Sequence, residues 1–152
     1  MATTDKDNVT DNRTQINKVF VYGTLMQNFS NYKRYLKGRI NRVMSGTTSG
    51  LLYHLPEGYP ALIAGNQPIK GEIIEPVDEK LLQILDRLED YAEGRNSNLY
   101  VREVRNILTE DGEEVACWVY IYANERYAQE NGILVPDGDW RKFMEKRGKF
   151  AT

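Results

Sequence analysis

Val19-Phe20-Val21-Tyr22-Gly23-Thr24-Leu25 is the stretch that decides the fold of this chain. Val and aromatic residues suit a pleated strand, and a short apolar run that meets a glycine is typical of a buried strand that ends abruptly. Gly23 has no Cβ, so its backbone can turn and can approach a ligand closely. The amides of Thr24 and Leu25 need no strand partner, and free convergent amides can bind an anion or a carboxylate. Two interpretations stay open here: an ordinary strand-to-turn junction, or half of a binding site.

The length and composition are those of one globular domain. The 152 residues can bury a core, and 41% hydrophobic with 28% charged residues is ordinary usage. The formal net charge of -2, without Lys and Arg clustered among aromatic residues, argues against a nucleic-acid partner. Residues 1–17 are polar, so we expect a disordered N-terminal leader there and a single domain over residues 18–150.

Cysteine and histidine are scarce in this chain. Cys117 is the single cysteine and His54 the single histidine, and they lie far apart in the sequence. This excludes an intramolecular disulfide and a cysteine-based metal cluster, and it argues against a zinc site or a Cys–His nucleophile. No apolar run approaches the roughly 20 residues of a membrane helix, and the N-terminal segment lacks the apolar core of a secretory signal. We therefore expect a cytoplasmic protein with no membrane partner.

Short strands and irregularly placed helices predict an α+β fold. Besides the first strand and an extended region at 43–55, strands are expected at 61–63, 69–75, 99–108 and 115–122. Helices are expected at 29–36, 78–91 and 138–146. A turn at Asp111-Gly112 joins the last two strands, and the strand after it is apolar on both faces, so it should be central in the sheet.

The helix expected over residues 78–91 carries an acid on its apolar face. At about 100° per residue, its apolar side chains span an arc of roughly 160°, and Glu89 falls inside that arc. Asp86, Glu79 and Asp90 fall roughly 40° to 80° beyond its edge. Glu89 is therefore the one acid of this helix that is expected to face the core, in the last turn before a loop.

A carboxylate on a buried face must be paired, neutral or beside a cleft. Burial and the negative end of the helix dipole both raise the pKa of Glu89 towards the range that suits proton transfer at neutral pH. The alternative is a structural ion pair with Arg102 or Arg105 on the following strand, since ion-pair networks also perturb pKa values.

Several segments follow one another in a specific order between residues 18 and 122. They are Phe20-Val21-Tyr22-Gly23-Thr24-Leu25, Tyr59-Pro60-Ala61-Leu62, Gly71-Glu72-Ile73, Leu85-Asp86-Arg87-Leu88-Glu89-Asp90-Tyr91, Tyr100-Val101-Arg102-Glu103-Val104 and Val119-Tyr120. This ordered set resembles the gamma-glutamylcyclotransferase-like superfamily, and its gamma-glutamylamine cyclotransferase / AIG2-like branch most closely. No single motif is decisive, and the similarity covers most of the domain.

The resemblance implies a small mixed β-barrel with flanking helices. It also implies an enzyme that releases an amine or amino acid from a small γ-glutamyl compound and forms 5-oxoproline, with no metal or cofactor required. By matching positions, the backbone amides of Tyr22-Gly23-Thr24-Leu25 hold the glutamyl carboxylate, and Glu89 is the general acid/base. Glu89 would take a proton from the attacking α-amine and hand it to the departing amine. The loop amides, or a hydroxyl such as that of Tyr100, would stabilise the oxyanion.

Two departures from the family pattern bear on the site. Many members have glycine after the glutamate, where this chain has Asp90, whose charge would raise the pKa of Glu89 further if it pointed inward. The loop 92–98 varies in such proteins, so the resemblance fixes neither the leaving group nor the role of Arg102, and the oligomeric state is not predicted. The alternatives are a non-catalytic small-ligand binding module that retains the Tyr22–Leu25 loop, and a structural or interaction protein.

Overall fold

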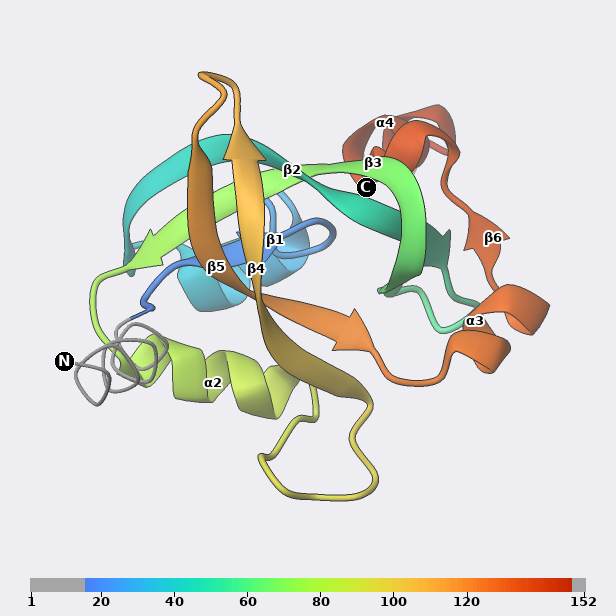
Figure 1. Cartoon of the computed structure of the whole chain (residues 1–152), viewed down its shortest axis with the longest axis horizontal. Coiled ribbons are helices and arrows are strands. Elements are labelled where there is room, and N and C mark those ends of the chain that lie inside the picture. Colours follow the sequence, from blue (N-terminus) through green and yellow to red (C-terminus); the bar gives the residue numbers. More distant parts are fainter. Residues whose placement is uncertain (1–15, 149–152) are drawn as a thin grey trace, which may run out of the picture.

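Strands β1 to β5 close into a mixed barrel, in the order β3-β1-β5-β4-β2, with β2 pairing back onto β3 (Figure 1). The computed structural model describes residues 16–148. The strands are β1 (Val19–Val21), β2 (Ile40–His54), β3 (Pro60–Pro76), β4 (Tyr100–Thr109), β5 (Glu114–Tyr122) and β6 (Ile133–Leu134), which extends the sheet beyond β2. Only the β1–β5 pairing is parallel among the strands of this described part. The expected α+β fold, a mixed barrel with flanking helices, is confirmed.

Short helices flank the barrel. They are the π-helix η1 (Tyr32–Leu36), α2 (Lys80–Leu88), α3 (Glu125–Asn131), the 3-10 turn η2 (Pro136–Gly138) and α4 (Trp140–Lys146). In Figure 1, α2 runs along one end of the barrel, whereas α3, β6 and α4 gather at its side. Within residues 16–148, none of the helices combines the length and the apolar character that crossing a membrane would require.

β1 is enclosed on both sides within the sheet. Its three residues are between 0% and 3% exposed, because β3 and β5 pair with it on either side. Phe20 lies opposite Ile73 of β3 and Val119 of β5. The interpretation of Val19–Val21 as a buried strand is therefore confirmed. The expected central place of β5 is confirmed as well, because it lies between β1 and β4.

The two short strands expected at 61–63 and 69–75 are one continuous strand, β3. β2 pairs with β3 along almost its whole length, and the register shifts between Gly50 and Leu51, which lie opposite Gln67 and Ile63. A break was expected after Ile63, but an irregularity in the pairing of β2 with β3 accommodates residues 64–66 without ending the strand.

The sequence predicts no element at residues 123–137, where α3 and β6 lie. The signal that could have found α3 is Asn124, whose side chain accepts a hydrogen bond from the Tyr127 amide at 3.0 Å as a helix N-cap. Of the leader expected at residues 1–17, residues 1–15 lie outside the described part of the chain. Ile16 precedes β1, and its carbonyl accepts a hydrogen bond from Trp118 Nε1 at 3.0 Å.

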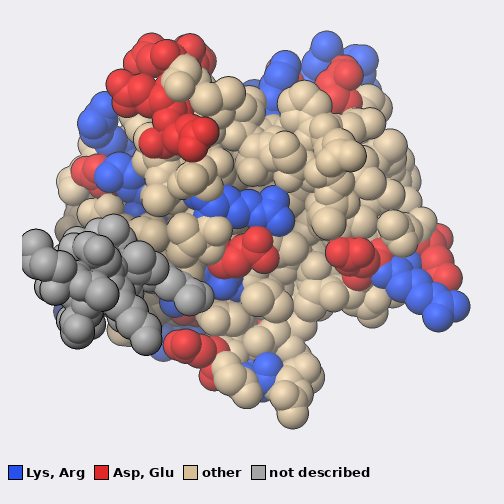
Figure 2. Space-filling model, in the orientation of Figure 1, with Lys and Arg blue, Asp and Glu red and all other residues tan. Residues whose placement is uncertain are grey.

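Figure 2 shows how charged side chains are distributed over one face of the molecule. Acidic side chains gather over the tip of the β4–β5 hairpin, whose sequence at residues 110–114 is Glu-Asp-Gly-Glu-Glu. Elsewhere on this face, basic and acidic side chains are interspersed.

The start of α4 allows a direct test of the local structure. Asp139 is the N-cap and accepts a hydrogen bond from the Lys142 amide at 3.0 Å, and the next residue, Trp140, is fully buried. Asp139→Ala is expected to lower the free energy of unfolding by about 1 kcal/mol, measured by urea denaturation. Asp139→Asn keeps a capping acceptor and should retain most of the stability. Equal losses in the two variants would contradict a capping role.

Candidate active site

One pocket contains all the residues for which the sequence predicted a role in a site. Tyr22, Gly23, Thr24 and Leu25 line it from the end of β1, Glu89 from the end of α2 and Tyr100 from the start of β4. Phe20, Val21, Pro60 and Tyr120 complete the wall. The pocket encloses about 300 Å³ of empty space, its open mouth included. Three segments that are distant in the sequence therefore meet at one cavity.

Neighbouring residues hold the loop after β1 in place. The Gly23 carbonyl accepts a hydrogen bond from the Met26 amide at 3.0 Å, and the Thr24 carbonyl accepts one from the Tyr32 amide at 3.2 Å. Asn31 Nδ2 donates to Thr24 Oγ1 at 2.8 Å. The carbonyls and the Thr24 hydroxyl thus make the contacts that fix the loop.

The amides of the same loop have no protein partner. Within residues 16–148, no acceptor takes the N–H groups of Gly23, Thr24 or Leu25. Adjacent backbone N–H groups that are left free at the wall of a pocket form a concavity suited to an anion. The loop therefore keeps three backbone donors free at the pocket, and carboxylate binding by them stays a prediction.

Gly23 is required here because another residue comes very close. A Cβ at this position would lie 2.4 Å from Pro60 Cγ, and the backbone φ of Gly23 is not in the left-handed region. The close contact is thus with the start of β3, which also lines the pocket. Any side chain at residue 23 would push the loop and Pro60 apart.

Glu89 ends α2 beside the pocket. Its amide donates to the Leu85 carbonyl at 2.9 Å, and its side chain is partly buried. Among the described residues, no group donates a hydrogen bond to its carboxylate and no cation pairs with it. Burial raises the pKa of Glu89 to about 7. At neutral pH this carboxyl can therefore both accept and release a proton.

The two arginines considered as ion-pair partners of Glu89 bind other acids. Arg102 Nη1 pairs with Asp86 Oδ2 at 3.1 Å, and Arg105 Nε pairs with Glu103 Oε2 at 2.9 Å. Glu89 therefore does not form the structural ion pair with Arg102 or Arg105 that was the alternative interpretation.

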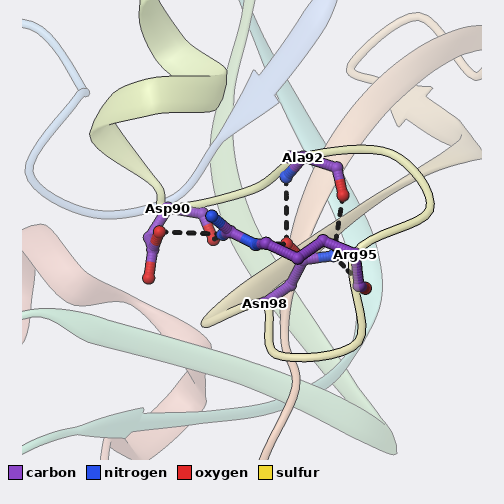
Figure 3. A network of polar contacts seen from close by, with 4 residues as sticks. All are labelled: Asp90, Ala92, Arg95 and Asn98. Atoms are coloured by element: carbon purple, nitrogen blue, oxygen red, sulfur yellow. Dashed lines mark hydrogen bonds and ion pairs between the residues drawn. The ribbon is translucent and has the colours of Figure 1, made fainter.

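Asp90 does not act on Glu89. Figure 3 shows its carboxylate turned to Arg95 of its own loop, and the two form an ion pair at 2.8 Å. Arg95 Nε and the Ala92 amide both donate to Asn98 Oδ1, so the loop is closed by its own polar contacts. With 59% of its side chain exposed, Asp90 does not meet the condition under which it would raise the pKa of Glu89.

The expectation that Glu89 is the only inward-facing acid of α2 is wrong. Asp86 is 22% exposed and accepts hydrogen bonds from the Tyr120 hydroxyl at 2.6 Å and from Arg102 at 3.1 Å. The arc on the helical wheel is defined by the apolar residues of the helix alone. Arg102 of β4 and Tyr120 of β5 are long polar side chains that reach the edge of this arc, and the sequence of the helix carries no information about them.

Tyr100 is buried, and its hydroxyl already has a partner. It is 3% exposed and donates a hydrogen bond to the Pro60 carbonyl at 2.5 Å. Burial, followed by the charges around it, raises the pKa of Tyr100 well above its ordinary value, so the hydroxyl keeps its proton. The Tyr100 hydroxyl is therefore a hydrogen-bond donor at the pocket wall.

Across the described chain, no three side chains of the His, Cys, Asp and Glu types come together as metal ligands would.

Comparisons with known proteins agree with this geometry. A family model described as gamma-glutamyl cyclotransferase, AIG2-like, matches residues 19–142, a range that contains every residue of the pocket. A protein of Halalkalibacterium halodurans, provisionally named a gamma-glutamylcyclotransferase, is 39% identical over 100 residues, which are 64% of this chain and 84% of that protein. The gamma-L-glutamyl-butirosin B gamma-glutamyl cyclotransferase of Niallia circulans is 32% identical over 126 residues, which are 82% of this chain and 76% of that protein. The crystal structure of an AIG2-like protein from Mus musculus has a TM-score of 0.62 and 28% identity, over 76% of this chain and 84% of that one.

Proposed function

Because the chain belongs to the gamma-glutamyl cyclotransferase, AIG2-like family of enzymes, we propose that it releases 5-oxoproline and a free amine or amino acid from a γ-glutamyl compound. The observation that carries this proposal is a single pocket lined both by three free backbone amides and by an unpaired carboxylate. The amides supply an anion site and the carboxylate supplies a proton acceptor, and the proposed reaction needs one of each.

The glutamyl part of the substrate would bind through its α-carboxylate. The N–H groups of Gly23, Thr24 and Leu25 would donate to the carboxylate oxygens. The α-amino group and the γ-carbonyl would then lie further into the pocket, near Glu89. Holding both ends of the glutamyl group favours the folded shape in which attack becomes intramolecular.

The chemistry requires one proton carrier. The α-amino nitrogen attacks the γ-carbonyl carbon, a ring C–N bond forms, and the bond from that carbon to the leaving nitrogen breaks. Glu89 takes the proton that the attacking nitrogen loses and gives it to the departing nitrogen. The oxyanion that develops between these steps would be stabilised by loop amides, or by the Tyr100 hydroxyl after it leaves the Pro60 carbonyl.

The pH dependence of kcat/KM tests the role of Glu89. Since Glu89 must be ionised to accept a proton and its pKa is about 7, kcat/KM is expected to rise with pH through a midpoint near that value. Initial rates between pH 5 and pH 9 measure this, with the ordinary α-amine pKa of about 8 for the substrate fitted as a second ionisation. A profile that is flat below pH 7 would exclude Glu89 as the base.

The activity itself is tested with purified protein and a panel of γ-glutamyl amino acids and γ-glutamyl amines. Release of 5-oxoproline from any of them supports the proposal and identifies the leaving group. If calorimetry instead detected binding of these compounds without release of 5-oxoproline, the chain would be a non-catalytic binding module. The cytoplasmic location, the absence of a metal or cofactor and the lack of a nucleic-acid partner stay predictions from the sequence.

A further inference from the structure

Tyr120 is held at both of its ends. It lines the pocket together with Glu89, and its hydroxyl donates a hydrogen bond to Asp86 Oδ1 at 2.6 Å. Its backbone carbonyl accepts a hydrogen bond from the Tyr22 hydroxyl at 2.5 Å. Tyr120 therefore connects the loop that begins at Tyr22 to the helix that carries Glu89.

Asp86 accepts hydrogen bonds from two sides. Arg102 donates to the oxygen that Tyr120 leaves free, and its guanidinium lies 4.3 Å from the centre of the Trp118 ring. The Arg102 and Asp86 side chains are only 15% and 22% exposed, so solvent screens this ion pair less than an exposed one. Burial raises the pKa of Asp86 above its ordinary value, and the hydrogen bond from Tyr120 and the charge of Arg102 offset part of that rise. With a cation on one oxygen, the carboxylate acts as an acceptor for the Tyr120 proton.

This arrangement decides what Tyr120 can offer to a ligand. A tyrosine hydroxyl has one proton to donate and two lone pairs. Since the proton is committed to Asp86, the Tyr120 oxygen can act only as an acceptor towards a ligand that reaches it. Within the glutamyl part of the substrate, the α-carboxylate and the γ-carbonyl only accept, so the α-amino group is the matching donor.

We propose that Asp86 is a positioning residue, which acts through Tyr120 to orient the substrate's α-amino group beside Glu89. This inference rests on the proposed function, because it assumes a γ-glutamyl ligand in the pocket. Asp86 lies in the last turn of α2 and Glu89 is the C-cap of the same helix, three positions later, so the two acids are near neighbours. The helix thus carries two acids with different tasks: Glu89 moves the proton, and Asp86 fixes the group from which it comes.

Steady-state kinetics of Asp86→Asn, Tyr120→Phe and the double variant test the inference. Each single change is expected to lower kcat/KM about 10- to 100-fold, the effect of losing a hydrogen bond to a charged group. Because Asp86 acts through Tyr120, the double variant should be no worse than Tyr120→Phe alone. Losses that multiply in the double variant would show that Asp86 acts independently, and would overturn the proposal.

A binding measurement separates orientation of the amine from a general change of pocket shape. Glu89→Gln serves as the background, so that the ligand stays intact during calorimetry. L-glutamine is one probe, and 5-amino-5-oxopentanoate, the same molecule without the α-amino group, is the other. Adding Tyr120→Phe should weaken binding of glutamine about 10-fold and leave binding of the deaminated analogue unchanged. Equal weakening of the two ligands would contradict the proposal.

Glu103→Gln is the matched control. It removes a carboxylate from another arginine pair of β4, at 2.9 Å from Arg105 Nε and away from the residues that line the pocket. This variant should leave kcat/KM unchanged, and thermal unfolding of every variant shows whether it is folded. The two ideas fail differently. A wild-type chain that releases no 5-oxoproline contradicts the proposed function, and the binding comparison, made with Asp86→Asn as well as Tyr120→Phe, then decides whether the two residues orient the α-amino group.

Discussion

Release of 5-oxoproline is expected to fall about 10³-fold when Glu89 is replaced by Gln, while the barrel stays folded. The amide has nearly the same shape as the carboxyl but can neither accept nor release a proton at neutral pH. No partner is orphaned by the change, because no described residue pairs with this carboxylate. The measurement is kcat for the best γ-glutamyl substrate, together with the melting temperature of the variant.

The difference in stability between Glu89→Gln and wild type should depend on pH in a defined direction. The pKa of Glu89 is about 7 in the folded chain, above its ordinary value of 4.5, so ionising it costs the folded state free energy. That cost is full above pH 7, declines as the pH falls, and is absent below about 4.5. Glu89→Gln is therefore expected to be more stable than wild type at pH 8, with a difference that shrinks towards pH 4.5.

Asp90→Asn is the matched control for Glu89→Gln. It removes the same charge one position later, from a side chain that is 59% exposed and paired with Arg95. Asn also tolerates the positive φ of 52° at this position. Its kcat should be that of wild type. Comparable losses in the two variants, or normal turnover in Glu89→Gln, would remove Glu89 from the mechanism.

Gly23→Ala is expected to disturb both stability and binding. Its Cβ would lie 2.4 Å from Pro60 Cγ, so the loop and the start of β3 must move apart. Overpacking of this kind typically lowers the free energy of unfolding by about 1–3 kcal/mol. The displaced amides would hold the carboxylate poorly, and kcat/KM should fall about 100-fold. Urea denaturation and initial rates measure the two effects.

A second change can show that the contact with Pro60 is the cause. Pro60→Ala removes Cγ but keeps the carbonyl that accepts the hydrogen bond from Tyr100. Combined with Gly23→Ala, it should restore part of the stability and part of kcat/KM, so that the double variant exceeds Gly23→Ala alone. Without any recovery in the double variant, the requirement for glycine would have another origin.

Local patterns in the sequence were enough to find both halves of the pocket. The run Val19–Val21 into Gly23 identified the buried strand and the loop. The position of Glu89 on the apolar arc of α2 identified the carboxylate. In each case the signal lies within one element, where side-chain periodicity and glycine have direct structural consequences. The loop and Glu89 line the same pocket because the barrel brings these two segments together, and the local patterns do not show this.

The contacts that support the pocket were not predictable in the same way. The bond between Tyr120 and Asp86 depends on how α2 docks against β5, and the contact between Gly23 and Pro60 depends on how β3 starts. These distances are set by packing between elements that are far apart in the sequence, and periodicity within one element carries no information about them. Asp86 was misjudged for this reason.

The pairing of β1 with β5 also constrains when the pocket can form. Val19 lies opposite Trp118, and the hydrogen bond from Tyr22 to the Tyr120 carbonyl joins residues that are 98 positions apart. During synthesis the loop at residues 22–25 is made early, yet the wall that completes its pocket emerges only after most of the chain. Such distant contacts are slow to form because loop closure precedes them. Recovery of binding during refolding should therefore report on closure of the barrel, and not on the formation of its first hairpin.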